Sequence, residues 1–341
     1  MYDMRKRILS YLQYVFFLGL GIFLVWWQLK SMTEIEKQEF YNALHHVNYW
    51  IIIPISAMSL LSHVSRSIRW KLMMEPLGFK PRLINLFSAT MVGYLANAAI
   101  PRLGEIIKCS LLAKYEKLKV DKLVGTIIVE RSFDFICYIF IIIITFLIQI
   151  DTLAFYVKKQ FQHFPSFHQT NFWVKAGIAI IVAIVAWILI KKIIKSKHSN
   201  KLLEKLVHFF KGIVEGFQSI RKLKQRRAFI FHTLFIWAMY LGQIYLGFKG
   251  MEGTHSLGLL PAFSVLTLTT LSMIITPGGI GSFPIFVMQT LLIYGINENL
   301  GRAFGWLMWG VSTSIIVLVG FLSLVMMPYI NKLFMQQTET E

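Results

Sequence analysis

The chain has 341 residues, of which 56% are hydrophobic and only 15% are charged. A soluble protein of this length needs more polar surface, so the composition excludes soluble enzymes and nucleic-acid-binding domains and indicates an integral membrane protein. The formal net charge is +18. In an apolar chain, such an excess of Lys and Arg is typical of cytoplasmic loops beside anionic lipid, and nucleic acid is not expected as a partner.

The first segment carries basic residues at 5–7, ahead of an apolar stretch over residues 8–29. That stretch is longer than the roughly 7 to 15 apolar residues of a secretion signal. It ends close to Trp26 and Trp27, and tryptophan is enriched where a helix leaves the membrane. We therefore expect a retained transmembrane helix here.

Further stretches are long and apolar enough to cross the roughly 30 Å hydrocarbon layer as helices. They cover residues 47–64, 123–150, 172–190, 228–248 and 303–328. Two other apolar regions, 83–117 and 257–296, are interrupted in the middle by Pro and Gly. Their arms of about 14 to 17 residues are short for a crossing, so each region predicts a hairpin that enters and leaves the membrane by one face.

Most basic residues gather in segments that this arrangement would place on one side of the membrane. They are 5–7, 66–82, 114–122 and 191–227. Because cytoplasmic loops collect Lys and Arg, both termini are predicted to be cytoplasmic in a multi-pass protein of the cell (cytoplasmic or inner) membrane. Hairpin 83–117 then enters from the cytoplasmic side, and hairpin 257–296 enters from the external side.

The order of these segments repeats along the chain. Residues 1–150 and 172–328 each contain two crossings, a hairpin and a third crossing, and an odd number of crossings inverts the second half relative to the first. Residues 196–227 are basic with one apolar stripe, which predicts a cytoplasmic amphipathic linker helix. The expected fold is an all-α polytopic membrane protein, a single integral membrane domain over 1–341, with about six full transmembrane helices and two re-entrant helical hairpins arranged as an inverted repeat.

Charged residues lie at the tip of the first hairpin. A charged side chain inside the membrane costs about 2.5 to 3.5 kcal/mol, so it normally pairs with another charge, faces a cavity or has a function. Pro101 disfavours helix before it, so the second arm should begin near Leu103 with its backbone amides aimed at the bilayer interior. That geometry suits an anion such as a phosphate, although a purely structural charge cluster is the alternative. The predicted ligand-binding residues of this tip are Asn97, Pro101, Arg102, Gly104, Glu105 and Lys108.

The second tip, TPGGIGS at 276–282, carries no charge. Its glycines, Gly278, Gly279 and Gly281, would let backbone amides approach a ligand, or would serve only close helix packing.

A carboxylate pair follows the first hairpin, because Glu130 and Asp134 share one helix face four residues apart. Two such carboxylates need cations or protons, so we predict a charge network with Arg131 and with the hairpin cations, Arg102 or Lys108. This network either locks the repeats together or couples proton or cation movement to gating, and Arg131 is also a candidate ligand-binding residue.

Arg66, Arg69 and Trp70 follow the second crossing at helical spacing, and they are predicted to be interface residues at the headgroup level. The two cysteines, Cys109 and Cys137, lie in apolar surroundings and suggest neither a disulfide framework nor a metal site. No hydrolase, phosphate-loop or zinc motif is present, so neither an enzyme nor a cofactor is expected.

Four motifs come in the order seen in one bacterial and archaeal family. They are RSIRW (66–70), NAAIPRLGE (97–105), VERSFD (129–134) and PGGIG (277–281). With them the chain resembles the lysylphosphatidylglycerol synthase transmembrane-region family, also called flippase-like or UPF0104. Members often carry an acidic residue three positions after the last glycine of the fourth motif, whereas this chain has Pro284 there.

The resemblance implies a lipid transporter or flippase that binds an anionic lipid headgroup or lipid phosphate at the hairpin tips. Relatives that make aminoacylated lipid carry a C-terminal aminoacyl-transferase domain, and this chain continues only thirteen residues past Pro328, so we expect the transmembrane part without the synthase. The alternative is an accessory membrane protein that presents a lipid-linked substrate to an envelope-biosynthesis enzyme. An intramembrane lipid-modifying enzyme is a third, weaker hypothesis.

Overall fold

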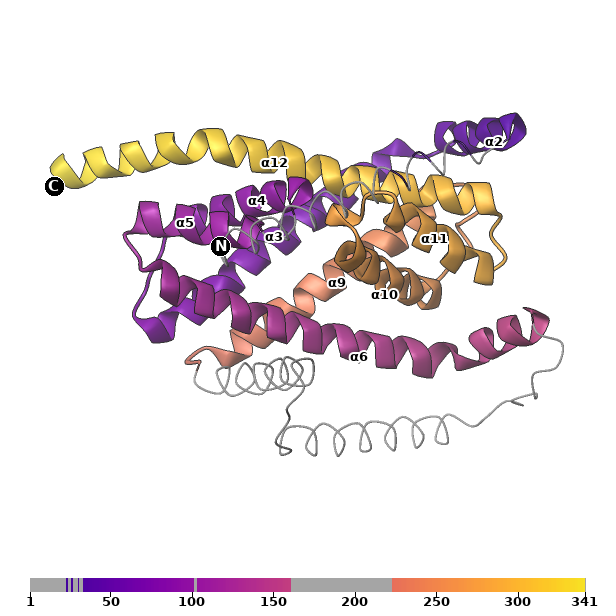
Figure 1. The fold of residues 1–341 in the computed structure, drawn as a ribbon, viewed down its shortest axis with the longest axis horizontal. Helices are drawn as coiled ribbons and strands as arrows, with labels where there is room; N and C mark the ends of the chain where they lie inside the picture. The colour runs from indigo at the N-terminus through magenta and orange to yellow at the C-terminus, as the bar shows by residue number, and fades with distance from the viewer. Residues whose placement is uncertain are drawn as a thin grey trace, which may run out of the picture. The chain divides into compact units, whose positions relative to one another are not determined.

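The computed structural model describes residues 33–100, 103–160 and 223–340, together with Phe23, Trp26 and Lys30. These residues are almost entirely helical (Figure 1). The elements are α2 (Glu34–His45), η1 (Tyr49–Ile51), α3 (Ile52–Met74), η2 (Glu75–Leu77), α4 (Leu83–Ala99), α5 (Leu103–Glu116), α6 (Val120–Gln160), α9 (Arg226–Gly250), α10 (Leu259–Ile275), η3 (Pro277–Gly279), α11 (Ser282–Ile293) and α12 (Glu298–Thr340). An isolated bridge joins Val47 and Met251, and the described residues form no other strand pairing. The all-α prediction is confirmed for this part of the chain.

Within the described ranges, four helical segments are long and apolar enough to cross a membrane: Tyr49–Leu77, Val120–Gln149, Arg226–Gly250 and Glu298–Phe334. They match the predicted crossings that start at 47, 123, 228 and 303. The predicted crossing 172–190 and the linker helix up to residue 222 lie outside the described residues, as does nearly all of 8–29. The total number of crossings therefore stays a prediction.

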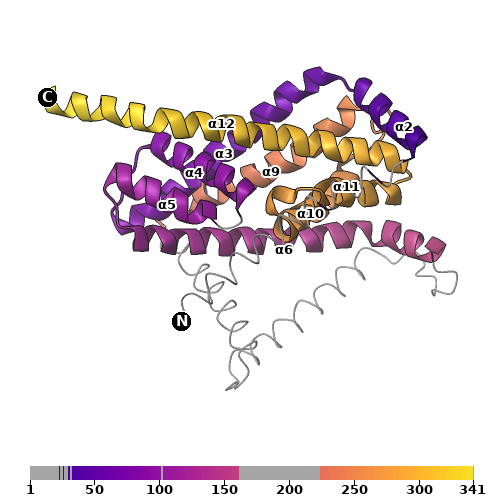
Figure 2. The ribbon, with the colours of Figure 1, turned by 45° about the horizontal axis from the view of Figure 1, so that its top comes forward.

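Both predicted hairpins contain two short helices with a break between them. α4 packs against α5, and α10 packs against α11 (Figure 2). Their breaks fall where the sequence places Pro and Gly, since α4 ends at Ala99 and α10 ends at Ile275, just before Pro277. Entry of each hairpin by one face of the membrane stays a prediction.

Helix lengths recur between the two predicted halves. α3, α4, α5 and α6 have 23, 17, 14 and 41 residues. The corresponding lengths of α9, α10, α11 and α12 are 25, 17, 12 and 43 residues. This recurrence agrees with the repeat inferred from the sequence, while the inversion of one half relative to the other stays a prediction.

The chain divides into two compact units. Unit 1 combines Met1–Val124 with Arg227–Glu341, and unit 2 is Gly125–Arg226. Both hairpins lie in unit 1 with α2, α3 and α12, whereas most of α6 belongs to unit 2. The site described below is built from unit 1.

Glycines on α12 allow it to pack closely on both hairpins of unit 1. A Cβ atom on Gly305 would lie 2.7 Å from Pro284 Cα of α11, and one on Gly320 would lie 2.9 Å from the Met91 carbonyl oxygen of α4. Small residues of this kind let helix backbones approach each other inside a membrane. α12 therefore connects the first hairpin to the second.

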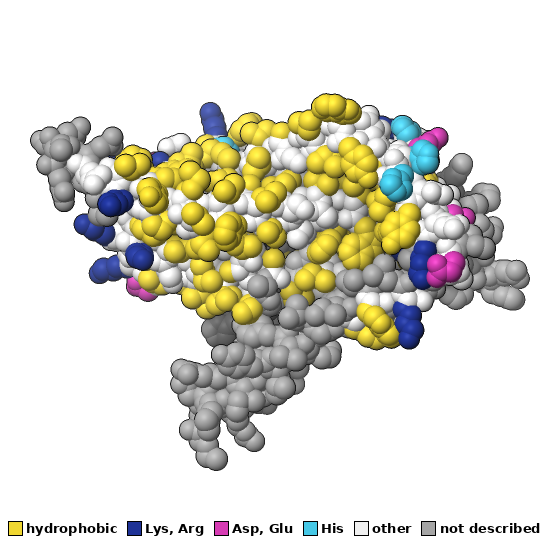
Figure 3. All heavy atoms as spheres, turned by 90° about the horizontal axis from the view of Figure 1, so that it is seen from above, with side chains coloured by type: hydrophobic (Ala, Val, Ile, Leu, Met, Phe, Trp, Pro, Cys, Tyr) yellow, Lys and Arg dark blue, Asp and Glu magenta, His cyan; other side chains and the backbone are white. Residues whose placement is uncertain are grey.

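One face of the molecule carries many apolar side chains in its middle part, with charged side chains toward both ends (Figure 3). On α12 the exposed apolar residues include Val317, Leu318, Phe321, Leu322, Leu324, Val325 and Met326. So many exposed apolar side chains on one helix would be unfavourable in water and are what a lipid-facing helix requires.

A buried amide pair joins the base of the first hairpin to the C-terminal part of α12. Asn85 and Asn331 donate to each other at 2.8 Å, and Asn85 Nδ2 also donates to Glu116 Oε1 at 2.5 Å. Replacing one asparagine with Leu should destabilise the protein by about 1 to 3 kcal/mol, because the other amide is left buried with an unmet hydrogen bond.

Thermal unfolding in detergent would measure this loss. The Asn85→Leu/Asn331→Leu double variant should lose less stability than the two single losses combined, whereas exposed Lys332→Ala should change nothing. If the stability loss of the double variant equals the sum of the two single losses, the two asparagines are not a coupled pair.

Candidate functional site at the hairpin tips

The first tip is closed by a cap across the break. Asn97, in the last turns of α4, accepts a hydrogen bond through Oδ1 from the Gly104 backbone N–H at 2.7 Å. Its Nδ2 donates to Glu105 Oε1 at 3.4 Å. The first amides of a helix have no intrahelical partner, so Asn97 caps α5 from outside its own helix. Pro101 and Arg102, which the sequence singled out at this tip, lie outside the described residues.

Gly104 is required at the first tip by packing. A Cβ atom at this position would overlap the carbonyl oxygen of Gly93 on α4 and would lie 2.6 Å from Asn97 Cγ. Gly104 has no positive φ, so the backbone conformation at this position does not require a glycine. The two arms of the hairpin touch backbone to backbone, which fixes where α5 begins.

The second tip uses glycine for its backbone conformation. Gly278, Gly279 and Gly281 have φ values of 58°, 71° and 72°, in the left-handed region that other residues avoid. Hydroxyl groups brace the loop, since Thr276 Oγ1 and Ser282 Oγ lie 2.6 Å apart. Ser282 also donates to the Ser272 carbonyl, so it ties the start of α11 to the end of α10.

Trp309 of α12 holds the second tip in place. Its Nε1–H donates to the carbonyl oxygen of Gly278 at 2.8 Å. The sequence alone does not indicate this contact, because a tryptophan in an apolar helix gives no local sign of a distant partner. The contact nevertheless orients the loop amides around Gly278.

The two tips meet within unit 1. η3 of the second tip packs against α4, and a Cβ atom on Gly278 would lie 3.8 Å from Cα of Ala98. Ala98 follows the capping residue Asn97. The capped start of α5 and the glycine loop belong to opposite halves of the chain, and they lie close together in the fold. The two predicted ligand-binding segments are thus adjacent.

Lys108 lies one turn beyond Gly104 on α5 and is inside the protein, with 4% of its surface exposed. Its Nζ atom is 4.0 Å from the ring centroid of Trp70, which is buried on α3. A cation over an indole face is attracted by the ring's electron density, and the attraction is stronger where water is excluded. The lysine predicted to bind an anion is therefore a buried cation close to the first tip.

The interface role predicted for Arg66, Arg69 and Trp70 needs correction. These side chains are buried, with 7%, 0% and 0% of their surfaces exposed, and therefore do not reach lipid headgroups at the surface. Arg66 donates to the Tyr240 hydroxyl and Arg69 donates to Thr233 Oγ1, each at 3.3 Å. Both arginines join α3 to α9.

Small polar residues on α3 are a sequence signal that could have predicted the burial of Arg66 and Arg69 against another helix. Ser59, Ser62, Ser65 and Ser67 surround the arginines and are all buried. Serines repeated through an apolar helix favour packing against another helix rather than lipid. Ser65 illustrates this, because its hydroxyl lies 2.8 Å from Nδ1 of His232 on α9.

The predicted charge network lies on α6, which is one continuous helix through Glu130, Arg131 and Asp134. Glu130 and Asp134 therefore share a helix face, as expected. These residues belong to unit 2, and their pairing with the hairpin cations stays a prediction. Across the described part of the chain, no group of three or more His, Cys, Asp or Glu residues could hold a metal ion.

Long apolar helices and two broken hairpins define a helical, multi-pass membrane protein. The family model of the lysylphosphatidylglycerol synthase transmembrane region matches residues 13–320, and the chain belongs to this family. The UPF0104 membrane protein MJ1595 of Methanocaldococcus jannaschii is 21% identical over 292 residues, which cover 81% of this chain and 84% of the relative. No solved structure matches the chain.

Proposed function

We propose that this protein moves a lipid between the leaflets of the cell membrane, and that the hairpin tips bind its anionic headgroup or phosphate. The observation that carries the proposal is the contact between the two tips, at Ala98 and Gly278. In secondary transporters built from inverted repeats, broken helices of this kind meet where the substrate binds near the bilayer midplane.

Buried positive charge supports an anionic ligand. Lys108, Arg66 and Arg69 are each at least nine-tenths buried within unit 1. A buried cation is costly in an apolar protein, so several of them together favour a site that attracts an oxyanion. Arg102 completes the cations assigned to the site in unit 1, where Glu105 balances the charge between states, while Glu130, Arg131 and Asp134 stay a predicted network on α6 of unit 2.

Backbone amides supply the second group of ligand contacts. The start of α5 has N–H groups at a helix N-terminus, and those other than the Gly104 amide, which Asn97 satisfies, are the ones assigned to the ligand. At the second tip, the left-handed glycines leave the chain without side chains that would block a headgroup. A phosphate held between the two tips would contact both halves, so its binding would respond to their relative movement.

Reconstituted vesicles test this function directly. The purified chain would be placed in liposomes that contain a fluorescent anionic phospholipid, and a membrane-impermeant reductant would bleach the outer leaflet. We expect the protein to make the inner-leaflet probe accessible, whereas empty liposomes keep it protected. Full protection with folded protein would favour the accessory role, and a change in the mass of the lipid would instead identify an enzyme.

The orientation proposed from the basic residues has both termini and the 191–227 region in the cytoplasm. A single cysteine at Thr33 or Gln162 should react with an impermeant reagent in intact cells, and one at Ser199 should react only after the membrane is broken. The opposite labelling pattern would overturn both the orientation and the inverted-repeat arrangement.

A further inference from the structure

A polar stripe lies at the start of α12, away from both hairpin tips in the sequence. Asn299, Arg302 and Trp306 follow each other at spacings of three and four residues, so they share one face of the helix. Asn299 and Arg302 each have only 8% of their surface exposed. We call these three residues the α12 polar stripe.

Each member of the stripe has a buried atom with an unmet hydrogen bond. Among the residues that the structure describes, Asn299 Oδ1, Arg302 Nε and Trp306 Nε1 contact no hydrogen-bond partner. Buried polar groups are almost always satisfied in folded proteins, so three exceptions on one helix face need an explanation. Two of these atoms are N–H donors, and one of the donors is positively charged.

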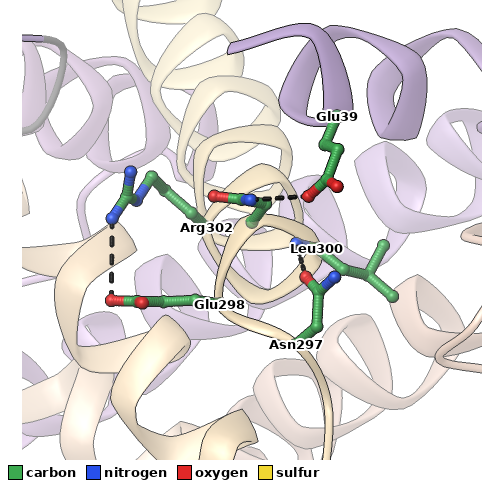
Figure 4. A network of polar contacts seen from close by, with 6 residues as sticks. Glu39, Asn297, Glu298, Leu300 and Arg302 are labelled. Atoms are coloured by element: carbon green, nitrogen blue, oxygen red, sulfur yellow. Dashed lines mark hydrogen bonds and ion pairs between the residues drawn. The ribbon is translucent and has the colours of Figure 1, made fainter. Parts of the chain in front are cut away.

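Two carboxylates border the stripe (Figure 4). Glu39, on α2, accepts a hydrogen bond through Oε2 from Asn299 Nδ2 at 2.7 Å. Glu298 Oε1 lies 3.7 Å from Nη2 of Arg302, beyond ordinary hydrogen-bond distance. The Glu39 carboxylate is therefore the anion that is hydrogen-bonded to the stripe, and it comes from a separate helix, α2.

We propose that the α12 polar stripe is a second anion site, for the phosphate of a lipid headgroup, and that Glu39 competes with that phosphate for the Asn299 Nδ2 donor. Carboxylate and phosphate oxygens are both anionic acceptors. When α2 moves and withdraws Glu39, Asn299 Nδ2 joins Arg302 Nε and Trp306 Nε1 as a third donor. The site also lies in the first turns of α12, where the helix dipole favours negative charge.

Exposed aromatic residues near α2 favour a phosphate carried by lipid. Tyr41 lies on α2, and Tyr49 and Trp50 follow it closely in the chain; all three are exposed. Tyrosine and tryptophan concentrate at the depth of lipid headgroups. A headgroup hydroxyl or ammonium would in turn donate to Asn299 Oδ1, the unmet acceptor of the stripe. This proposal is independent of the function proposed for the hairpin tips.

Binding to the purified full chain in detergent tests the proposal. The probes are dihexanoyl phosphatidylglycerol, inorganic phosphate and uncharged dihexanoylglycerol. Glu39→Gln should bind the short-chain phospholipid about tenfold tighter, because a charged competitor becomes neutral. The matched control is Glu34→Gln, because Glu34 is exposed on the same helix and pairs with Lys37, so the affinity of this variant should not change.

Arg302→Gln should weaken binding about tenfold, and Trp306→Phe should weaken it severalfold while keeping an aromatic ring. The same affinity should be unchanged in Lys114→Met, because Lys114 is exposed on α5 and belongs to neither proposed site. Unchanged phospholipid binding in Arg302→Gln would overturn the site. If Arg302→Gln fails to fold, unchanged binding in Trp306→Phe would overturn it instead. Unchanged or weaker binding in Glu39→Gln would overturn its competition with the ligand. Equal binding of inorganic phosphate and phospholipid would overturn the lipid assignment.

Discussion

A Gly104→Val protein should fail to form the first hairpin, with a loss of about 3 kcal/mol or more in stability. The added side chain would overlap the Gly93 carbonyl oxygen and press on Asn97, the residue that caps α5. The neighbouring atoms include backbone, which cannot rotate away as a flexible side chain would. The variant therefore loses both the close contact between the arms and the cap, which alone is worth about 1 kcal/mol.

Yield and thermal stability in detergent would measure this effect, with Gly310→Ala as the matched control. Gly310 lies inside α12 and has nothing within 4 Å of an added Cβ atom. Alanine there should leave stability unchanged or raise it by about 0.5 to 1 kcal/mol, because glycine is a poor helix former. A Gly104→Val protein as stable as Gly310→Ala would show that the hairpin arms are not in contact.

The helices and their breaks could be predicted from the sequence because their causes are local. Apolar length predicted the crossing that became α3, and proline predicted the ends of α4 and α10. The side of each helix that faces protein could not be predicted as well. Arg66 and Arg69 show the difference, since a basic pair near the end of an apolar helix reads as an interface anchor, although both side chains pack on α9.

The sequence could anticipate contacts at the first tip only where the two partners are close in the chain. Asn97 and Gly104 are seven residues apart, and both lie in the one short segment that the proline break marks in the sequence. The contact of Gly278 with Ala98 and the hydrogen bond from Trp309 depend on tertiary packing, for which one sequence carries no local sign. The Glu39 contact with Asn299 was missed for the same reason.

Lys108→Met should abolish lipid transport while the protein stays folded, if Lys108 binds the lipid phosphate. Methionine keeps an unbranched stem against Trp70 but removes the charge that lies 4.0 Å from the ring. Losing a hydrogen bond to a charged ligand corresponds to roughly ten- to hundredfold weaker binding. Lys114→Met is the control, because Lys114 is exposed on the same helix and should leave transport unchanged.

Arg102 should behave in the same way, with a graded response that distinguishes binding from structure. Arg102→Ala should abolish transport, and Arg102→Lys should keep part of it, because the charge remains while the planar two-donor geometry is lost. If Arg102 or Lys108 instead belongs to a structural ion pair, removing it should lower stability by about 3 to 5 kcal/mol, because the partner charge stays buried. A second change at Glu105, Glu130 or Asp134 would then restore stability. Rescue by such a change would assign these cations to the charge network, whereas stable single variants that no longer bind lipid would assign them to the ligand.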